Sequence, residues 1–387
     1  MSSENQAILI GLAGDVLIDR EDPHEIFSEV HELLQAPDIL FANLESPYSD
    51  TPGIAVTAPM VLVPGAHNLD AYVSAGFDVM SMANNHIVDA GHAAMLETRS
   101  RLRMQGIATC GAGENLMDAR RAAVLERGTL KVGFLAYSSI FPHGYEARST
   151  VPGLAPLRAY NHFHEGLPEY FAPGYLPRIE TIPDPQDHRN LQQDIAGLRE
   201  SADVVVVSFH WGDHLRPFVL TDHETRTARL CIDRGADMVI GHHHHALRGI
   251  EWYQGKPVFY GLGHFVFDFR LPLTDEVKRY LEEADPQSYA ILPREGWPLL
   301  PLHPDTRMTA LAWARVQGKR VTDVGFVPCR LRPDGRVVAV DVDCTEGREV
   351  ISYVIQCNQT QKLNGRIVTD GAPLVGGHKS VRVIPLE

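Results

Sequence analysis

Short, uniformly apolar runs alternate along this chain with segments that carry helix signals. The apolar runs have the length of buried strands and lie at 7–13, 39–42, 77–82, 107–110, 131–137, 204–209 and 238–240. The predicted helices lie between them, at 23–35, 68–75, 90–105 and 221–235. Alternation of this kind is typical of an α/β domain.

The last two of these strands show the pattern most clearly, because each ends in histidine. His210 follows one run, and the histidines at 242–245 follow the next. The helix between them has capping-box spacing at Thr221 and Glu224, and Gly235 stands where its C-terminus would need a positive φ. Because strand, helix, strand order favours parallel pairing, we expect these histidines at one edge of a sheet.

Two irregular stretches interrupt the alternation, at 141–190 and at 270–310. Segments of this length are typical of lids and binding loops, and the many aromatic residues of the first favour a lid, with Tyr145 as a substrate contact. Packing of these aromatics against the core is an equally weighted alternative.

From Met308 onward the pattern becomes that of β-strands, at 309–316, 322–331 and 337–342. These strands could add antiparallel strands to the same core or form a small subdomain. We predict one domain over 1–310, with both irregular stretches as lid insertions, and a β-rich C-terminal extension of the same core over 311–387.

Composition narrows the class of protein. The chain has 387 residues, of which 44% are hydrophobic and 22% charged, as in ordinary globular proteins. A formal charge of −14 opposes nucleic-acid binding. No apolar run approaches a membrane span, and the five scattered cysteines suit reduced thiols, so we expect a cytoplasmic protein without membrane contact. The expected partner is a small-molecule or peptide substrate, and the oligomeric state has no sequence signal.

Polar residues suited to metal binding stand at five predicted strand ends. They are Asp15, Glu45, Asn85 with His86, His210, and His243 to His245. Any one of them alone would more often be a cap or a core histidine. Their coincidence at the same relative place favours a site for Mn²⁺, Fe or Zn²⁺, with two ions and a bridging carboxylate as one arrangement.

The same residues carry a family resemblance. The blocks are GDVLIDR at 14–20, ANLESP at 42–47, ANNHIVDAG at 83–91, HWGDH at 210–214 and GADMVIGHHHHALRGIE through GHFVFD at 235–268. With them the chain resembles the CapA-type poly-γ-glutamate capsule proteins, a branch of the calcineurin-like metallophosphoesterase superfamily. The resemblance implies a four-layer αββα sandwich.

The resemblance also implies roles for individual residues. Asp15 and His245 would bind one divalent transition metal, and Glu45 would be the bridging carboxylate. The second metal would be bound by Asn85, His210 and His243. His86 matches the catalytic histidine of the superfamily, and we expect it to act as a general acid.

Several positions depart from the family pattern. Leu17 stands where the superfamily motif has a histidine ligand, so the first metal lacks one donor. His264 replaces a common asparagine, His244 a common proline, and His214 lies where a carboxylate is usual. We predict His264 as a second catalytic residue, and His214 and His244 as substrate contacts.

Three functions fit this set of residues. The first is a metal-dependent hydrolase in which metal-bound hydroxide attacks a phosphoester or an amide or γ-glutamyl bond. The second is a metal-independent peptide epimerase with Asp15 and a histidine, His264 or His86, as its acid/base pair. The third is a non-catalytic accessory protein of polymer biosynthesis. The hydrolase is favoured because the ligand set is nearly complete.

Overall fold

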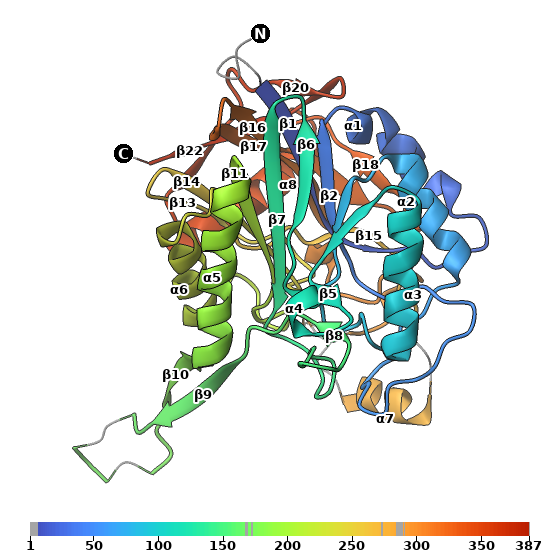
Figure 1. The fold of residues 1–387 in the computed structure, drawn as a ribbon, viewed down its shortest axis with the longest axis vertical. Helices are drawn as coiled ribbons and strands as arrows, with labels where there is room; N and C mark the ends of the chain where they lie inside the picture. The colour runs from blue at the N-terminus through green and yellow to red at the C-terminus, as the bar shows by residue number, and fades with distance from the viewer. Residues whose placement is uncertain are drawn as a thin grey trace.

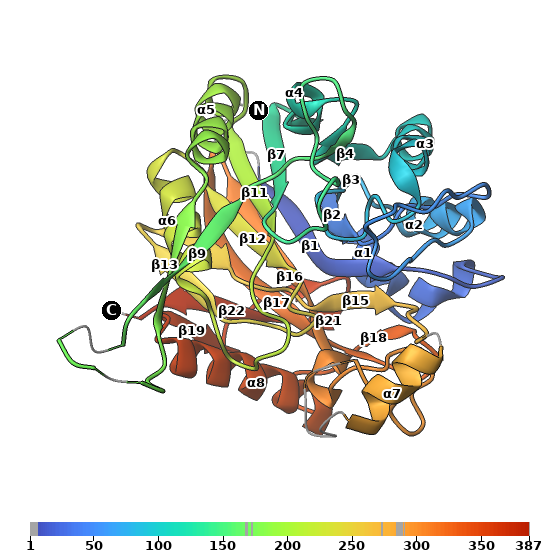
Figure 2. The same ribbon diagram turned by 90° about the horizontal axis from the view of Figure 1, so that it is seen from below.

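The computed structural model describes residues 7–166, 169–171, 173–271, 274–283, 289 and 291–386. Figure 1 shows the chain as two sheets with helices on their outer sides, and Figure 2, seen from below, separates the layers. The order is helix, sheet, sheet, helix. The predicted four-layer α/β sandwich is therefore confirmed.

The larger sheet joins the two ends of the chain. Its main path is β19 (Gly365–Val368), β22 (Val381–Pro385), β17 (Arg320–Leu331), β16 (Met308–Gln317), β1 (Ala7–Leu17), β2 (Ile39–Leu44), β3 (Val79–Ser81) and β4 (Ala108–Cys110). Off this path, β15 (His264–Phe267) pairs with β1 and β18 (Val337–Ala339) pairs with β17. Because β16 lies antiparallel beside β1, the C-terminal strands extend the sheet that the N-terminal strands begin.

The smaller sheet carries the two histidine-terminated strands. Its order is β13 (Ile250–Tyr253), β14 (Lys256–Phe259), β12 (Met238–His242), β11 (Val204–His210), β7 (Leu130–Ser138) and β6 (Ala123–Arg127). β11 is parallel to β12, as predicted, and it is also parallel to β7. The carboxyl ends of these strands consequently meet at one edge.

Helices cover the outer face of each sheet. On the larger sheet they are the 3-10 helix η2 (His24–Val30), α1 (His31–Gln35), α2 (Leu69–Ala75) and α3 (Gly91–Met104). On the smaller sheet they are α5 (Pro185–Ser201) and α6 (Asp222–Asp233). The capping box predicted for α6 is present, since Thr221 and Glu224 bond reciprocally, and Gly235 has φ 107° after the helix end.

The central core lies between the two sheets. It combines apolar side chains of β1, β2 and β16 with those of β7, β11 and β12. Phe41 of β2 stacks on Phe134 of β7 with ring centroids 5.5 Å apart, which ties the sheets together directly. Close packing of this kind fixes the position of each sheet relative to the other.

Two elements differ from the sequence prediction. The helix expected at 23–35 is divided into η2 and α1, because Val30 leaves helical geometry with φ −128° and ψ 13°. The C-terminal part contains an unpredicted helix, α8 (Thr345–Gln361). Its β-branched residues favour a strand locally, but burial of Val350, Val354 and Cys357 on one helical face overrides that preference.

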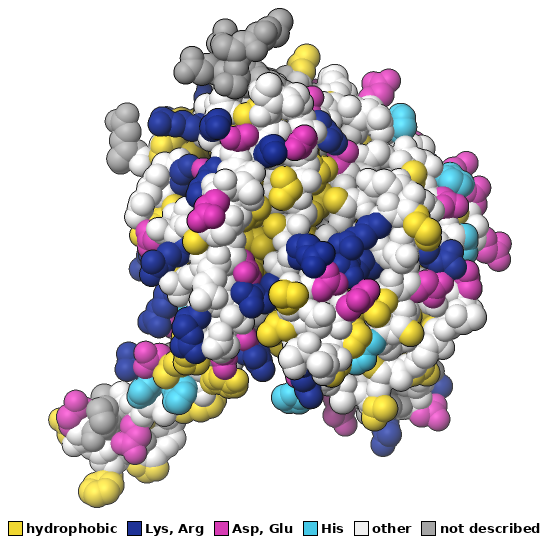
Figure 3. All heavy atoms as spheres, viewed as in Figure 1, with side chains coloured by type: hydrophobic (Ala, Val, Ile, Leu, Met, Phe, Trp, Pro, Cys, Tyr) yellow, Lys and Arg dark blue, Asp and Glu magenta, His cyan; other side chains and the backbone are white. Residues whose placement is uncertain are grey.

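The irregular stretch at 141–190 contains a hairpin, β9 (Ala159–His164) and β10 (Arg178–Pro183). The hairpin projects from the body of the molecule, with apolar side chains at its tip (Figure 3). Phe163 is 68% exposed and Phe171 fully so. The lid prediction stays a prediction, and residues 167, 168 and 172 of the first stretch and 272, 273, 284–288 and 290 of the second lie outside the described residues.

Short elements complete the chain. They are η3 (Ala66–Asn68), β5 (Ala112–Gly113), α4 (Leu116–Ala119), β8 (Gly153–Leu154), α7 (Asp275–Glu283), η4 (Pro304–Arg307), β20 (Leu374–Val375) and β21 (His378–Lys379). Among the described residues, no helix has the length and apolar character to span a membrane.

Candidate metal centre

Strand ends from both sheets meet in one buried cluster. On the larger sheet, Asp15 of β1 is in register with His264 at the start of β15. On the smaller sheet, His210 of β11 is in register with His242 of β12. Parallel pairing delivers polar side chains to this common edge, as the sequence pattern predicts.

Asp15 occupies the middle of the cluster. Its ligand oxygens lie within 4.8 Å of donor atoms in two sets, one formed with His245 and His264 and the other with Glu45 and His210. Asn43 joins the carboxylates, because its Nδ2 donates to Asp15 Oδ1 at 2.9 Å and to Glu45 Oε2 at 2.7 Å. Asp15 is therefore shared by both candidate metal positions.

The first set contains His245, which follows β12, and His264, which begins β15. His245 Nδ1 lies 2.5 Å from His264 Nε2. The His264 ring is fully buried and stacks on Phe267 with centroids 3.8 Å apart. His264, which we predicted to be catalytic, thus lies among potential metal donors.

The second set gathers around His210. Its Nε2 lies 2.6 Å from Asn85 Oδ1, 3.1 Å from His243 Nδ1 and 3.7 Å from Glu45 Oε1. The structure therefore brings together the residues for which the family resemblance implied the second metal, with Glu45 beside them.

The loop after β12 has unusual backbone geometry. His243 has φ 88° and His245 has φ 59°, values that residues with a Cβ rarely adopt. Such conformations cost about 1–3 kcal/mol each and cluster at functional sites. They turn both imidazoles of this loop towards the cluster.

Burial sets the charge state of the cluster in the metal-free protein. It lowers the pKa of His210, His243 and His245 well below the usual value, and that of His264 to about 4. These imidazoles are neutral at pH 7, as metal ligands must be. Burial, together with repulsion from Asp15, raises the pKa of the Glu45 carboxyl.

The donor set fits a divalent metal. Glu45 Oε1 is buried without a hydrogen-bond partner, and in the described part of the chain the ion pairs of Asp15 and Glu45 involve only histidines. Two adjacent buried carboxylates without a lysine or arginine need a positive charge. A mixed set of carboxylate, amide and imidazole donors suits Mn²⁺, Fe or Zn²⁺.

His86 stands beside the cluster in a different environment. Its side chain is 13% exposed, and its Nδ1 lies 2.8 Å from Asp89 Oδ2. Tyr145, predicted as a substrate contact, is buried and donates its hydroxyl to Asp89 Oδ1 at 2.7 Å. With Nδ1 held in this way, His86 presents Nε2 as the nitrogen free for chemistry.

The two remaining predicted residues have different surroundings. His244 is buried, and its Nε2 lies 2.8 Å from Glu224 Oε1, so the N-terminal cap of α6 holds it under the loop. His214 lies against the rings of His243 and His245, with centroids 4.8 and 5.6 Å away. His214 also lines a cleft beside the cluster.

This cleft adjoins the cluster and has a volume of about 900 Å³. Its wall is mostly apolar, with Leu17 and Met60 among its residues, and it carries Asp19, Asp268 and Arg270 as charged groups. A cavity of this size suits a small organic molecule or part of a peptide.

Sequence reasoning assigned no role to three contributors, Asn43, Asp89 and His242. His242 Nδ1 lies 3.1 Å from Asp15 Oδ1. Asn43 and Asp89 stood within the quoted blocks ANLESP and ANNHIVDAG. Asn43 lies two residues before the predicted ligand Glu45, and Asp89 lies three residues after His86, the predicted general acid. Only the fold shows that they join and orient such residues.

Comparison with known proteins identifies the family. A family model described as bacterial capsule synthesis protein PGA_cap matches residues 9–269. The chain belongs to this family. Every residue of the cluster lies within the matched range, so the PGA_cap region contains the whole candidate metal centre.

Relatives of this chain include the PGA biosynthesis protein CapA of Bacillus subtilis, 27% identical over 67% of this chain and 61% of that protein. A probable polyglutamine synthesis accessory protein of Mycobacterium tuberculosis is 30% identical over 68% of this chain and 66% of that protein. The chain thus spans less than two thirds of the length of either relative.

Solved structures resemble the fold more distantly. A hypothetical protein from Thermus thermophilus is 13% identical, with 83% of this chain and 98% of that chain covered and a TM-score of 0.46. The calcineurin-like phosphoesterase YfkN from Bacillus subtilis is 11% identical, with 92% and 98% covered and a TM-score of 0.37. Similarity at this level says nothing about activity.

Proposed function

We propose that this protein is a metal-dependent hydrolase of the PGA_cap family that cleaves a phosphoester or an amide bond, including a γ-glutamyl bond. The observation that carries the proposal is the convergence of two carboxylates and several neutral imidazoles around Asp15. Two ions of the Mn²⁺, Fe or Zn²⁺ kind would balance these buried charges. Bound there, they would supply an activated water and a positive charge for the developing oxyanion.

The residues of the chain would divide the remaining work. Asn43 donates to one oxygen of Asp15 and to one of Glu45, which would orient the two carboxylates for metal binding. His86 would donate a proton from Nε2 to the leaving group, since Asp89 holds its Nδ1. Tyr145 would act indirectly, because its hydroxyl donates the hydrogen bond that holds Asp89 in place.

The cleft beside His214 would bind the substrate. Its mixture of apolar wall and few charges suits a small molecule or a peptide segment. The formal charge of −14 argues against nucleic acid as a substrate.

Geometry weighs against an epimerase that uses Asp15 and His264 as its two bases. Such an enzyme brackets an α-carbon, with each base about 3 Å away on opposite faces, so the bases need roughly 6 Å between them. The donor atoms of Asp15 and His264 lie within 4.8 Å of one another. This spacing suits a shared metal better than a carbon between two bases.

Activity assays with controlled metal content test the proposal. Chelated protein would be reloaded with Mn²⁺, Fe²⁺ or Zn²⁺ and given p-nitrophenyl phosphate, bis-p-nitrophenyl phosphate and γ-glutamyl-p-nitroanilide. We expect turnover that requires metal and falls at least about 100-fold in His210→Ala. His188→Asn, on α5, is the matched control. Full turnover in chelated protein or in His210→Ala would refute metal-dependent hydrolysis.

A further inference from the structure

We infer that His264 is a ligand of the first metal and supplies the donor that is missing at Leu17. The inference rests on the proposed metal centre and goes beyond the ligand set that the family resemblance implies. It also changes the role that the sequence suggested for His264, from acid–base catalysis to metal binding.

Backbone pairing fixes His264 next to Asp15. β15 lies parallel to β1 with these two residues in register, and the Asp15 amide donates to Gly263 O at 2.8 Å. A Cβ added at Gly14 would lie only 2.0 Å from the same carbonyl oxygen, so the approach of the two segments requires glycine there. The position of His264 is therefore a property of the sheet and does not depend on a surface loop.

Side-chain contacts direct the His264 ring at the first metal position. Stacking on Phe267 with an interplanar angle of 15° sets the ring plane. Its Nε2 then lies 2.5 Å from His245 Nδ1, and both belong to the set within 4.8 Å that includes Asp15. Donors of one tetrahedral ion with bonds near 2.1 Å are separated by about 3.4 Å, so one ion would reach all three after small adjustments.

Leu17 explains why a donor from another strand is needed. It lies two residues after Asp15 on β1, is 2% exposed and packs in the apolar cluster with Phe267 and Phe269. A leucine offers no donor atom at this place. His264, on the strand paired with β1, brings an imidazole to the same metal from the neighbouring position, which leaves His86 as the general acid.

Metal titration of variants tests this assignment without an activity assay. Metal-free protein would be titrated with Co²⁺, which gives a visible absorption spectrum, and its metal content measured by elemental analysis. We expect two ions per wild-type chain, and in His264→Asn one ion lost or bound at least about 10-fold more weakly. His188→Asn, on α5, is the matched control and should bind like the wild type. Recovery of the second ion in Leu17→His combined with His264→Asn would show that the two positions serve the same metal.

The alternative outcomes are distinct. If His264→Asn binds two ions as tightly as the wild type while Asp15→Asn loses them, the metal centre is real and the assignment of His264 is wrong. If the wild type itself binds no metal, the proposed function fails and the assignment with it. Should His264→Asn not fold, ¹⁵N imidazole shifts of the wild type decide, because Zn²⁺ must shift the Nε2 resonance of His264 for the assignment to hold.

Discussion

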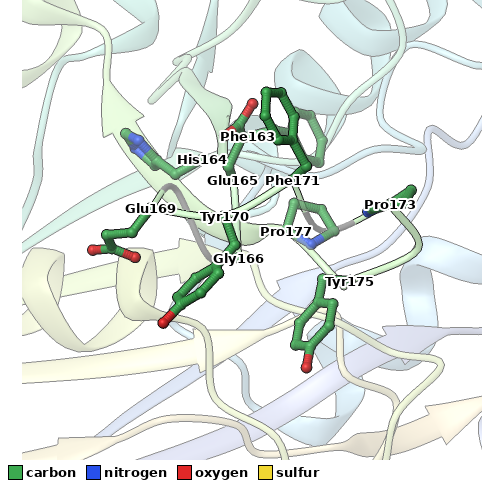
Figure 4. Close-up of a pocket in the computed structure, with 10 residues that line it drawn as sticks. All are labelled: Phe163, His164, Glu165, Gly166, Glu169, Tyr170, Phe171, Pro173, Tyr175 and Pro177. Carbon is green, nitrogen blue, oxygen red and sulfur yellow. The ribbon is translucent and has the colours of Figure 1, made fainter.

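Polar residues usually lie at the surface of a protein and apolar residues in its interior. The candidate metal centre and the β9–β10 hairpin depart from this distribution in opposite ways. In the centre, Asp15, Glu45 and His264 are fully buried, although burial of polar groups costs free energy. In the hairpin, Phe163 and Phe171 lie exposed, and the described residues that line the pocket of about 760 Å³ in Figure 4 all belong to the hairpin, from Phe163 to Pro177.

The difference lies in what supports each region. The centre lies where both sheets end and is held by strand pairing, whereas the hairpin is a separate two-stranded sheet beyond them. Isolated two-stranded hairpins are only marginally stable. The candidate metal centre therefore lies in the supported region, and changes in the two regions should have very different effects.

Substitution of Asp15 should have the largest effect, because this carboxylate is shared by both candidate metal positions. In Asp15→Asn we expect loss of both metals and a fall in kcat/KM of roughly 10³-fold, about 4 kcal/mol. Elemental analysis and steady-state kinetics measure the two quantities. Retention of two metals by this variant would contradict the central place of Asp15.

Substitutions of Asp89 and Tyr145, which support His86, should have an intermediate effect and leave the metal content unchanged. Asp89→Asn removes the carboxylate that holds His86 Nδ1, and we expect kcat to fall about 10- to 100-fold with little change in KM. A shift of the pH profile of kcat in Asp89→Asn would separate a role in orienting His86 from a purely structural one.

Tyr145→Phe removes one hydrogen bond to Asp89 and should cost about 1.5–3 kcal/mol of stability.

Acid should destabilise the metal-free protein through the buried imidazoles. Below about pH 6.5 the unfolded chain binds protons that the folded protein does not, because burial lowers the pKa of His210, His243, His245 and His264. The free energy of unfolding should therefore fall as pH falls from about 6.5 towards 4, by up to about 1.4 kcal/mol per pH unit for each group.

Glu45 has the opposite effect above about pH 4.5, since its pKa is raised, but it is one group against four. Chemical denaturation of chelated protein between pH 7 and 5 measures the slope. A stability that is constant over this range would show that the imidazoles are not held neutral by burial. His264→Asn should give a shallower slope than the wild type.

Changes in the hairpin should have the smallest effect. Phe163→Ser combined with Phe171→Ser alters two exposed side chains, so we expect a stability change below about 0.5 kcal/mol and unchanged metal content. Leu198→Ala, on the buried face of α5, is the contrasting variant and should cost about 2–5 kcal/mol. Loss of metal in the hairpin variant would show that the two regions are coupled.

Local patterns in the sequence predicted much of the fold and the membership of the cluster. The apolar runs, the capping box of Thr221 and Glu224, and the polar residues at strand ends are short-range features, so they are visible without a structure. Helix α8 was missed because its β-branched residues favour a strand until burial against the sheet is known. The projecting hairpin was missed because its residues carry no clear periodicity.

The sequence by itself determined which donors the protein has and which strands carry them. Only the tertiary structure decided how these donors are grouped: that Asp15 is shared, that Tyr145 acts on Asp89, and that His264 comes next to Asp15. The physical reason is that pairing between strands far apart in the chain depends on the burial and register of whole sheets. No local run of residues contains that information.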